Sequence, residues 1–539
     1  VENYVSDNFG DAPLHGGGVC AKRIKCELRL RKSNPRLMSA SFPRFQNQPH
    51  GQCRLRQDCA GARSTRSSRT ASAARHGRRR KTDMNRSGAI AMQGDGKKRL
   101  WTLPLLLGAG LMASAVAEEN AERSKEGFIE GSEVNLLLRN FYFNRDFRKG
   151  QSSPAGGGYT EEWVQGFMAN FSSGFTQGTL GVGIDAFAQL GVRLDSGGGR
   201  SGAGGSVDLL PYDDQGRPQD NYSRAGGAVK LRWYGTVLRV GDVFPETPVI
   251  QYGNSRLFPS SFRGFTLVND SLAKGLTLQA GKLNSMTQPN STSGSDDFYS
   301  FYTGRRIDSP WVAYAGGDYQ ATEHWSVSLY GSRQKDAWDQ YYAGTSFNYP
   351  LDDKLSLLGG ANYYKVKDQG RQVMGELDND IWSVRGGFAY GPHQVLLSYQ
   401  RNNGDDDFDY LRQTDSIYLD NSIQYSDFNS PKERSLMLRY DLDMAAFGVP
   451  GLSFMTRYGK GWDADYSNAN SVYMRTDANG NPLTNQGRWE RDVEVKYVVQ
   501  GGAAKDLAFR VRQATVRSDS FESDLDEVRL IVEYPLQVL

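Results

Sequence analysis

The sequence predicts an all-β fold, a transmembrane antiparallel β-barrel of roughly 16–20 strands with one loop folded inward as a constriction. After residue 117, segments of about ten residues alternate between apolar and polar side chains, which is the period-two pattern of strands with one apolar and one wet face. No stretch of this region is apolar for the ~20 residues that a membrane helix requires. A closed barrel in lipid fits both observations, because it turns apolar side chains to the lipid and pairs every backbone group.

Several segments show which side chains share a face. Each apolar set alternates with polar or charged residues, and the apolar sets are Val229, Leu231 and Trp233; Leu436, Leu438, Tyr440 and Leu442; Leu452, Phe454, Thr456 and Tyr458; Val493, Val495, Tyr497 and Val499; Leu507, Phe509 and Val511; and Val528, Leu530, Val532 and Tyr534. Aromatic residues near the segment ends are typical of the two interfacial girdles of a membrane barrel. The alternative, a secreted soluble β-protein, would need another explanation for so many cations on the wet face.

Residues 1–117 differ from the rest of the chain. They carry 22 Lys and Arg against 7 Asp and Glu, whereas residues 118–539 carry 42 against 54. An apolar run follows Lys97-Lys98-Arg99 and closes on Ala-Val-Ala, so we interpret residues 92–117 as a secretory signal peptide. We interpret residues 1–91 as a disordered, non-native upstream extension from a misplaced start, with a nucleic-acid-binding arm as the alternative. Residues 118–539 are then the barrel.

The predicted barrel has little catalytic or metal-binding chemistry. All the cysteines of the chain precede residue 117: Cys20, Cys26, Cys53 and Cys59. The only histidines after that point, His324 and His393, lie in turn-like contexts, so zinc sites of ordinary ligand spacing are excluded. A Ser–His nucleophile pair has little support, and the glycine-rich stretch 197–205 lacks the strand–helix context of a phosphate-binding loop. We expect no enzyme activity, no catalytic residues, no metal site and no cofactor.

Cations concentrate on the wet face of the predicted strands, although residues 118–539 carry an acidic excess. We predict that they form a basic ladder for solute on the inner wall: Arg139, Lys230, Arg232, Arg239, Arg385, Arg439, Arg457, Lys496, Arg510 and Arg512. Arg139 belongs to it if the first strand, Val134–Phe143, keeps its alternation. Guanidinium groups bind carboxylates through a two-pronged fork, and successive weak sites let an anion move along. The alternative is that each cation is merely solvated or pairs with a carboxylate such as Asp441 or Glu494.

A segment without alternation, residues 241–265, interrupts the strand pattern. It contains three prolines and several aromatic residues, and it is long and apolar for an exposed loop. We interpret it as a loop folded into the barrel, with an extracellular lid as the alternative. The charged residues that we expect near the constriction are Asp242, Glu246, Arg256 and Arg263, together with Asp427 of the segment Asn421–Asn429, which we expect to meet the cationic end of a solute.

These segments resemble those of the OprD family of outer-membrane porins, the substrate-specific channels for carboxylate-containing small molecules in pseudomonads. The matching segments are Leu138–Arg148, Pro259–Gly264, Asn421–Asn429 and the specific run Leu438–Tyr458. The resemblance spans essentially all of residues 118–539. It implies a barrel of about 18 strands, a lumen narrowed by the third extracellular loop, and a ladder of basic residues. Arg439 and Arg457 lie in the matching run, whereas the chain end, Tyr534–Leu539, lacks the usual terminal aromatic residue.

The ladder and the resemblance together predict an outer-membrane porin of a Gram-negative bacterium that gives passive, selective diffusion of small carboxylates, either amino acids or aromatic and cyclic acids. A general-diffusion porin, an outer-membrane barrel enzyme and a surface adhesin are the alternatives. The expected partners are outer-membrane lipid, lipopolysaccharide and the barrel-insertion machinery. We expect no nucleic acid, and a monomer or a loose trimer.

Overall fold

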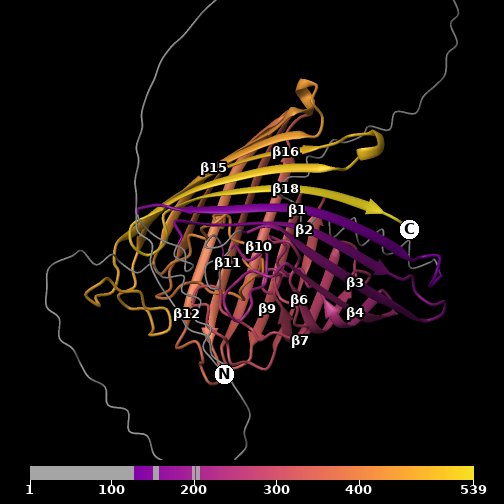
Figure 1. Cartoon of the computed structure of the whole chain (residues 1–539), viewed down its shortest axis with the longest axis horizontal. Helices are drawn as coiled ribbons and strands as arrows, with labels where there is room; N and C mark the ends of the chain where they lie inside the picture. The colour runs from indigo at the N-terminus through magenta and orange to yellow at the C-terminus, as the bar shows by residue number, and fades with distance from the viewer. Residues whose placement is uncertain (1–126, 150–156, 197–200, 202–206) are drawn as a thin grey trace, which may run out of the picture. The chain divides into compact units, whose positions relative to one another are not determined.

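The computed structural model describes residues 127–149, 157–196, 201 and 207–539, so the interpretations of residues 1–91 and 92–117 lie outside it. The described residues form 18 β-strands (Figure 1). Their bounds are β1 Glu133–Phe147, β2 Tyr159–Ser172, β3 Leu180–Asp195, β4 Asn221–Trp233, β5 Thr236–Val243, β6 Ser261–Asn269, β7 Leu276–Thr287, β8 Val312–Thr322, β9 Trp325–Gln334, β10 Trp338–Pro350, β11 Leu355–Asp368, β12 Asp378–Tyr390, β13 His393–Asn402, β14 Arg434–Asp443, β15 Leu452–Ala464, β16 Gln486–Val498, β17 Ala508–Ser518 and β18 Leu525–Gln537.

The strands form one closed antiparallel barrel (Figure 1). Each strand pairs with its neighbours in the chain, and β1 pairs with β18, where Arg139 lies opposite Glu533. Closure leaves no strand edge unpaired, as the hydrocarbon layer of a membrane requires. The predicted fold class is therefore confirmed, and the strand number equals the one that the family resemblance implies.

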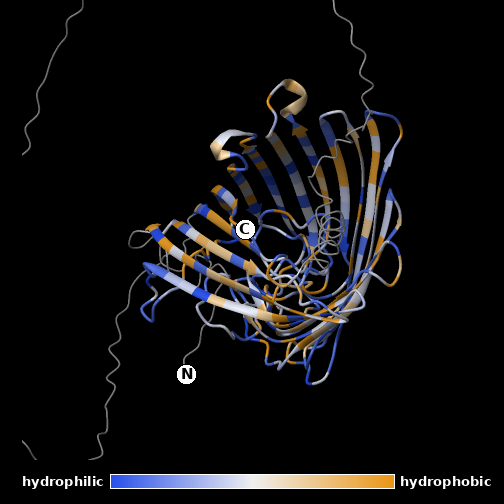
Figure 2. Ribbon diagram, turned by 90° about the vertical axis from the view of Figure 1, so that its right-hand side faces the viewer, coloured by the Kyte–Doolittle hydropathy of each residue, from blue (hydrophilic) through white to orange (hydrophobic). Residues whose placement is uncertain are grey.

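The two faces of the barrel wall have the polarity that the alternation predicts. On the outer face, Leu438 of β14 is 54% exposed and Phe454 of β15 is 37% exposed. Arg439, which follows Leu438 and therefore points to the other face, is 6% exposed. Figure 2 shows the same alternation as bands of hydrophobic and hydrophilic residues along the strands. Apolar side chains thus cover most of the outside, and Arg439 of β14 and Arg457 of β15 belong to the inside.

The two ends of the barrel differ in the length of their connections. At the turn end, short turns join the strands, and Tyr234 and Gly235 between β4 and β5 both have positive φ, as a tight hairpin turn requires. At the loop end, the connections include residues 244–260, 403–433 and 465–485. The described residues contain two short 3-10 helices, Met444–Phe447 and Gly502–Ala504, and none of their helices is long and apolar enough to cross a membrane.

The long connections fold back into the lumen and form a hydrophobic core there. We call residues 244–260 the inner loop and residues 403–433 the long loop. One buried cluster joins both loops to β11: Val249, Ile250, Phe408, Leu411 and Tyr364. A second cluster joins the inner loop to β1: Leu257, Phe258, Phe141 and Phe143. Figure 2 shows loop segments inside the ring of strands.

Two predicted boundaries were wrong. The first strand does not end at Phe143 but continues to Phe147, because its backbone pairs with β2 and β18 as far as that residue. The segment without alternation is shorter than predicted, because β5 extends to Val243 and β6 begins at Ser261. Asp242 and Arg263 therefore lie on paired strands, directly opposite each other, and not in the inner loop.

Candidate functional site

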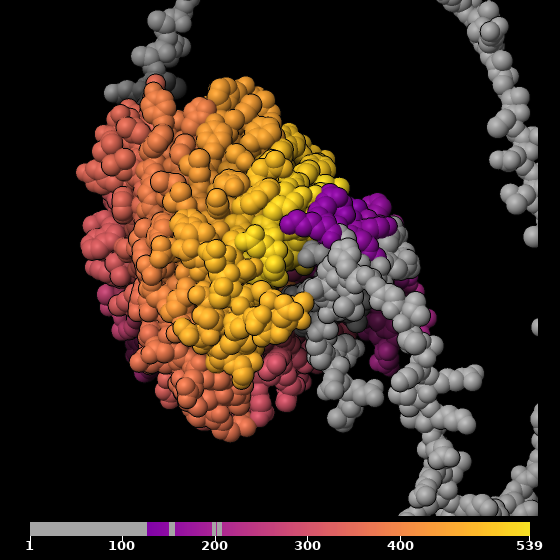
Figure 3. Space-filling view, turned by 90° about the vertical axis from the view of Figure 1, so that its left-hand side faces the viewer, coloured from indigo at the N-terminus to yellow at the C-terminus, as the bar shows by residue number. Residues whose placement is uncertain are grey.

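A cavity of about 1030 Å³ occupies the lumen between the inward loops and the turn end. On the loop side it is bounded by Phe244 and Glu246 of the inner loop and by Tyr418 and Asp420 of the long loop. On the other side it reaches Asp270, which follows β6 at the turn end. Figure 3 shows the loop end covered by a nearly continuous layer of chain from orange to yellow. The inward loops are thus the part of the structure that narrows the passage.

The inner loop is attached to the wall on two sides of the lumen. The Arg139 guanidinium on β1 donates to the carbonyls of Arg256 and Leu257 at 2.8 and 2.9 Å. The Tyr364 hydroxyl on β11 donates to the Pro248 carbonyl at 2.9 Å. Since β1 and β11 lie roughly opposite each other in a ring of 18 strands, the inner loop spans the lumen. The inner loop therefore crosses the inside of the barrel from β1 to β11 and is not an extracellular lid.

Four of the predicted ladder residues line the cavity: Arg239, Arg385, Arg439 and Arg457. Carboxylates line it as well, among them Asp185, Asp242, Asp318 and Asp420. The wall of the cavity therefore carries both signs of charge.

Asp185 on β3 holds two of the predicted cations. Lys230 Nζ lies 2.7 Å from Asp185 Oδ1, and Arg239 Nε lies 3.1 Å from Asp185 Oδ2. The buried Lys230 also donates to Ser172, so it has little capacity left for a solute. Arg239 gives only its Nε to a carboxylate, and its terminal nitrogens have no hydrogen bond with a described residue. The Arg232 guanidinium lies 4.7 Å from the centre of the Phe175 ring.

Arg439 and Arg457 lie directly opposite each other on β14 and β15. Arg439 makes a two-pronged pair with Asp441 at 2.7 Å for both bonds, while Arg457 Nε donates to Asp492 at 2.6 Å. The terminal nitrogens of Arg457 make no hydrogen bond with a described residue. These pairs reduce the repulsion between the two neighbouring guanidinium groups, and Arg457 keeps a free fork beside the cavity.

Arg385 and the cations of the last strands are also paired. Arg385 lies 2.5 Å from Asp420 of the long loop. Glu494 on β16 lies 3.0 Å from Arg512 and 3.6 Å from Arg510. Lys496 lies opposite Arg510 and makes no ion pair with a described residue. The predicted alternative, in which ladder residues pair with carboxylates such as Asp441 and Glu494, therefore describes most of these cations.

Several inward arginines lie outside the predicted ladder, among them Arg145 on β1 and Arg529 on β18. Both pair with the buried Glu527, at 2.8 and 2.6 Å respectively. Arg529 alternates with the apolar set that contains Val528 and Leu530, so the alternation in the sequence was enough to predict that it points inward. Arg145 was missed because the predicted first strand ended at Phe143, whereas β1 continues to Phe147 and Arg145 is its next inward residue.

The predicted constriction residues divide into two groups. Asp242, paired with Arg263 at 3.0 Å, and the exposed Glu246 both line the cavity. Arg256 does not: its guanidinium lies 5.5 Å from the centre of the Phe143 ring, on the wall side of the inner loop. Burial lowers the pKa of Arg256 to about 10, so it remains charged at neutral pH.

Asp427 lies in a joint between loops and not on the cavity wall. It is buried and accepts hydrogen bonds from the hydroxyls of Tyr302, Tyr410 and Ser422, at 2.5, 2.9 and 2.5 Å. Burial raises the pKa of the Asp427 carboxyl. Asp427 itself does not line the cavity, although its partner Ser422 does.

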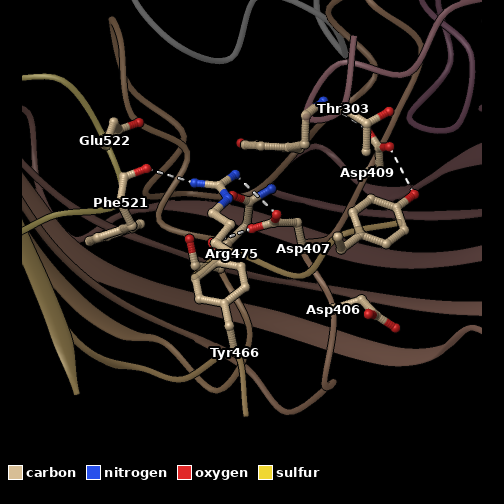
Figure 4. Close-up of polar contacts among 12 residues, drawn as sticks. Thr303, Asp406, Asp407, Asp409, Tyr466, Arg475, Phe521 and Glu522 are labelled. Carbon is tan, nitrogen blue, oxygen red and sulfur yellow. Dashed lines mark hydrogen bonds and ion pairs between the residues drawn. The ribbon is translucent and has the colours of Figure 1, made fainter. Parts of the chain in front are cut away.

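A second polar joint ties the long loop to the loops that follow it (Figure 4). Arg475 lies between the long loop and residues 519–524, donating to Asp407 at 3.1 Å and to the Phe521 carbonyl at 2.8 Å. The Tyr466 hydroxyl also donates to Asp407, at 2.9 Å. Buried pairs of this kind hold the loops in one arrangement, since each partner left alone would be a desolvated polar group.

The cavity wall presents charged groups of both signs to a solute. In the described residues no group of three or more His, Cys, Asp or Glu side chains is placed to hold a metal ion. The cavity instead offers guanidinium groups with free terminal nitrogens beside carboxylates that compete for them.

Comparison with known proteins agrees with this description. Residues 126–538 match a family model described as outer membrane porin, OprD family. Porin D of Pseudomonas aeruginosa is 41% identical over 451 residues, which cover 81% of this chain and 98% of that protein. The crystal structure of Pseudomonas aeruginosa OccK9 (OpdG) has a TM-score of 0.70 at 38% identity and covers 77% of this chain and 100% of its own. That of Pseudomonas aeruginosa OpdK with vanillate has a TM-score of 0.67 at 35% identity, covering 76% and 100%.

Proposed function

The chain belongs to the OprD family of outer membrane porins, and from that premise we propose that its lumen passes small carboxylate-containing solutes selectively. It is an outer-membrane β-barrel whose relatives are channels and not enzymes. The observation that supports selectivity is that the guanidinium groups of Arg239 and Arg457 keep free terminal nitrogens beside the cavity. Both line the cavity, both give a carboxylate only their Nε, and both keep the terminal nitrogens that bind a carboxylate as a fork.

The path of a solute follows from the same geometry. A carboxylate that reaches the cavity replaces water at the free nitrogens of Arg457 while Asp492 keeps the guanidinium in place. Arg439, held by Asp441 of the same strand, adds positive potential without a free fork of its own. The nearby carboxylates weaken the attraction, so the solute is released and diffuses on. The crystal structure of the related OpdK was determined with vanillate, which is a small aromatic carboxylate, and this supports the proposed solute class.

The test compares benzoate with its neutral counterpart benzamide in proteoliposomes. We expect the unaltered protein to pass benzoate faster, and Arg239→Gln with Arg457→Gln to slow benzoate entry about tenfold, which corresponds to about 1.4 kcal/mol. Benzamide entry should stay unchanged. Arg217→Gln, which removes a cation from an exposed ion pair with Asp213, is the matched control and should alter neither rate. Equal loss of both solutes would mean that the double variant only damaged the pore.

A general-diffusion porin is the second candidate function. The observation that favours it is the nearly balanced charge of the cavity wall, where Asp185, Asp242 and Asp420 each pair with a lining or neighbouring cation. In that case the unaltered protein would pass benzoate and benzamide at equal rates. The first measurement of the same experiment therefore separates the two functions.

We also propose that residues 92–117 direct export and that the mature protein begins at Glu118. The support is the cationic start, the short apolar run and the Ala-Val-Ala that closes it. N-terminal sequencing of the protein extracted from outer membranes should give Glu-Glu-Asn. Recovery of membrane-inserted protein that still carries residues 1–91 would contradict this proposal.

A further inference from the structure

Five adjacent strands carry a cation on their outer face close to the loop end. We call these residues the outer basic belt: Arg401 on β13, Arg434 on β14, Lys460 on β15, Arg491 on β16 and Arg517 on β17. Each lies an even number of positions from an exposed apolar residue of its own strand, as Lys460 does from Tyr458 and Arg491 from Val493. Side chains two apart share a face of the sheet, so the belt lies outside the barrel.

The strand register makes the belt continuous. Arg401 lies opposite Arg434, Lys460 lies opposite Trp489, and Trp489 lies opposite Arg517. Arg491 is two positions beyond Trp489 on β16, which makes it a diagonal neighbour of both Lys460 and Arg517. At about 4.8 Å between strands, the belt extends roughly 19 Å along the barrel wall.

Much of this positive charge has no acidic partner. Arg434 lies 3.5 Å from Asp463, and Arg517 lies 3.1 Å from Asp526. Arg401, Lys460 and Arg491 make no ion pair with a described residue, and the buried Arg401 Nε has no hydrogen-bond partner. Like charges on neighbouring strands destabilise a sheet unless something compensates them.

A nearby part of the wall, β9 to β11, has outward cations at the same end of the barrel that are compensated by carboxylates. On β9 to β11 the outward cations face carboxylates directly. Arg333 pairs with Asp339 at 2.6 Å, Lys365 pairs with Asp378, and Lys367 lies opposite Asp339 in the register. The excess of positive charge in the belt therefore does not extend to β9–β11.

The belt also borders a cleft with aromatic walls. A cleft of about 410 Å³ at the loop end is lined by Lys460, Arg517, Trp462 and Trp489. The Trp489 ring stacks on Tyr458 at 5.8 Å between centres. Tryptophan and tyrosine lie at the level where hydrocarbon meets headgroups. Lipid-facing cations are costly at the bilayer centre and nearly free of cost at this level.

The loop end of an outer-membrane barrel faces the cell exterior, so the belt lies at the headgroups of the outer leaflet. We propose that the outer basic belt binds the phosphorylated sugar headgroup of lipopolysaccharide. Arginine offers a phosphate two parallel hydrogen bonds and lysine a point charge, and several cations along the wall match several phosphates on one headgroup. The cleft beside Trp489 takes the adjoining part of the sugar. This surface is separate from the lumen, so the inference is independent of the proposed solute class.

The test measures how much lipopolysaccharide the purified barrel retains in detergent, by native mass spectrometry with a preparation that lacks the O-chain. The variant is Lys460→Gln with Arg491→Gln, because neither residue has an acidic partner among the described residues. The matched control is Lys365→Gln with Lys367→Gln, which removes the same charge at the same end of the barrel, where carboxylates compensate it. We expect the apparent Kd to rise roughly ten- to thirtyfold in the first variant. In the control it should change less than about twofold.

Two further arms identify the ligand. Enzymatically dephosphorylated lipopolysaccharide should bind both variants and the unaltered protein equally weakly. Inorganic pyrophosphate should not displace the lipid, and displacement would assign the belt to free phosphate anions instead. Equal losses in both double variants, or no loss in either, would overturn the proposal. If the double variant fails to fold, as judged by its mobility on an unheated gel, Lys460→Gln alone tests the same contact, because Lys460 is exposed.

Discussion

Replacing Arg139 with glutamine is expected to release the inner loop from the wall. The buried Arg139 side chain makes four contacts with parts of the chain far apart in sequence. Its Nε donates to Glu533 at 2.8 Å, and one terminal nitrogen reaches the Arg256 carbonyl, the Leu257 carbonyl and Asn254. Glutamine is too short to reach the loop from β1, so two loop carbonyls and one carboxylate lose their donor.

The size of the effect follows from burial. Removing one partner of a buried ion pair costs about 3–5 kcal/mol, and the partial exposure of Glu533, 26% of its side chain, favours the lower end. About 3 kcal/mol corresponds to a roughly 150-fold change in the ratio of attached to detached loop. The Tyr364 contact on the opposite wall remains, so the loop should swing about that point and not leave the lumen.

Planar-bilayer recording is the assay. The Arg139→Gln channel should show a larger mean conductance and rapid switching between levels, because the detached loop narrows the lumen less. Arg139→Lys is the matched control: it keeps the charge beside Glu533 but lacks the planar fork, and should give an intermediate phenotype. A conductance equal to that of the unaltered protein, with folded barrel in the membrane, would refute the assignment of Arg139 as an anchor of the constriction.

Three further predictions concern buried polar groups. Asp185→Asn leaves the buried Lys230 without its carboxylate and should lower the stability of the barrel by about 3 kcal/mol, measured by urea unfolding in detergent. Tyr364→Phe removes the donor to the Pro248 carbonyl and should cost about 1–2 kcal/mol and raise channel noise. Burial raises the pKa of Asp409 to about 6. Because folding raises this pKa, the native state binds the proton more tightly, so the stability of the long loop should fall as pH rises from about 4 to about 6. The fall should be seen as lower amide protection factors, which correct for the intrinsic rise of exchange with pH.

Each of these predictions has a distinct contrary result. Unchanged unfolding of Asp185→Asn would show that the Lys230 ammonium is solvated. Equal noise in Tyr364→Phe and the unaltered channel would mean that the inner loop does not depend on its β11 contact. For Asp409, the fall in protection factors with pH should disappear in Asp409→Asn, and persistence of the same slope would assign it to another group.

Much of the candidate site was visible in the sequence because a strand has a period of two. Arg439 and Arg457 were placed inside by the alternation around them, and their inward direction is what the barrel shows. The same rule failed on β1, where Phe141 and Phe143 point inward beside Arg139. They do so because the inner loop packs over them, and a loop from another part of the chain leaves no trace in the local pattern.

The ion-pair and hydrogen-bond partners of the charged residues were harder to predict from the sequence. Asp185 lies in a strand rich in small residues, without a clear alternation, and nothing near it in sequence indicates that it pairs with both Lys230 and Arg239. Asp427 was taken for a solute contact because it lies in a polar loop segment. Its burial depends on Tyr302 and Tyr410, which arrive from another loop and from elsewhere in the long loop.

The sequence by itself determined the fold class, the outer and inner faces of the strands and the existence of an inward segment, because these follow from local periodicity and from the need of backbone groups in lipid to be paired. Only the tertiary structure decided which cations keep a free fork, which loop joints are buried and how the inner loop crosses the lumen. Those properties depend on contacts such as Arg139 with Leu257 and Arg457 with Asp492, which barrel closure and loop packing bring together from distant parts of the chain.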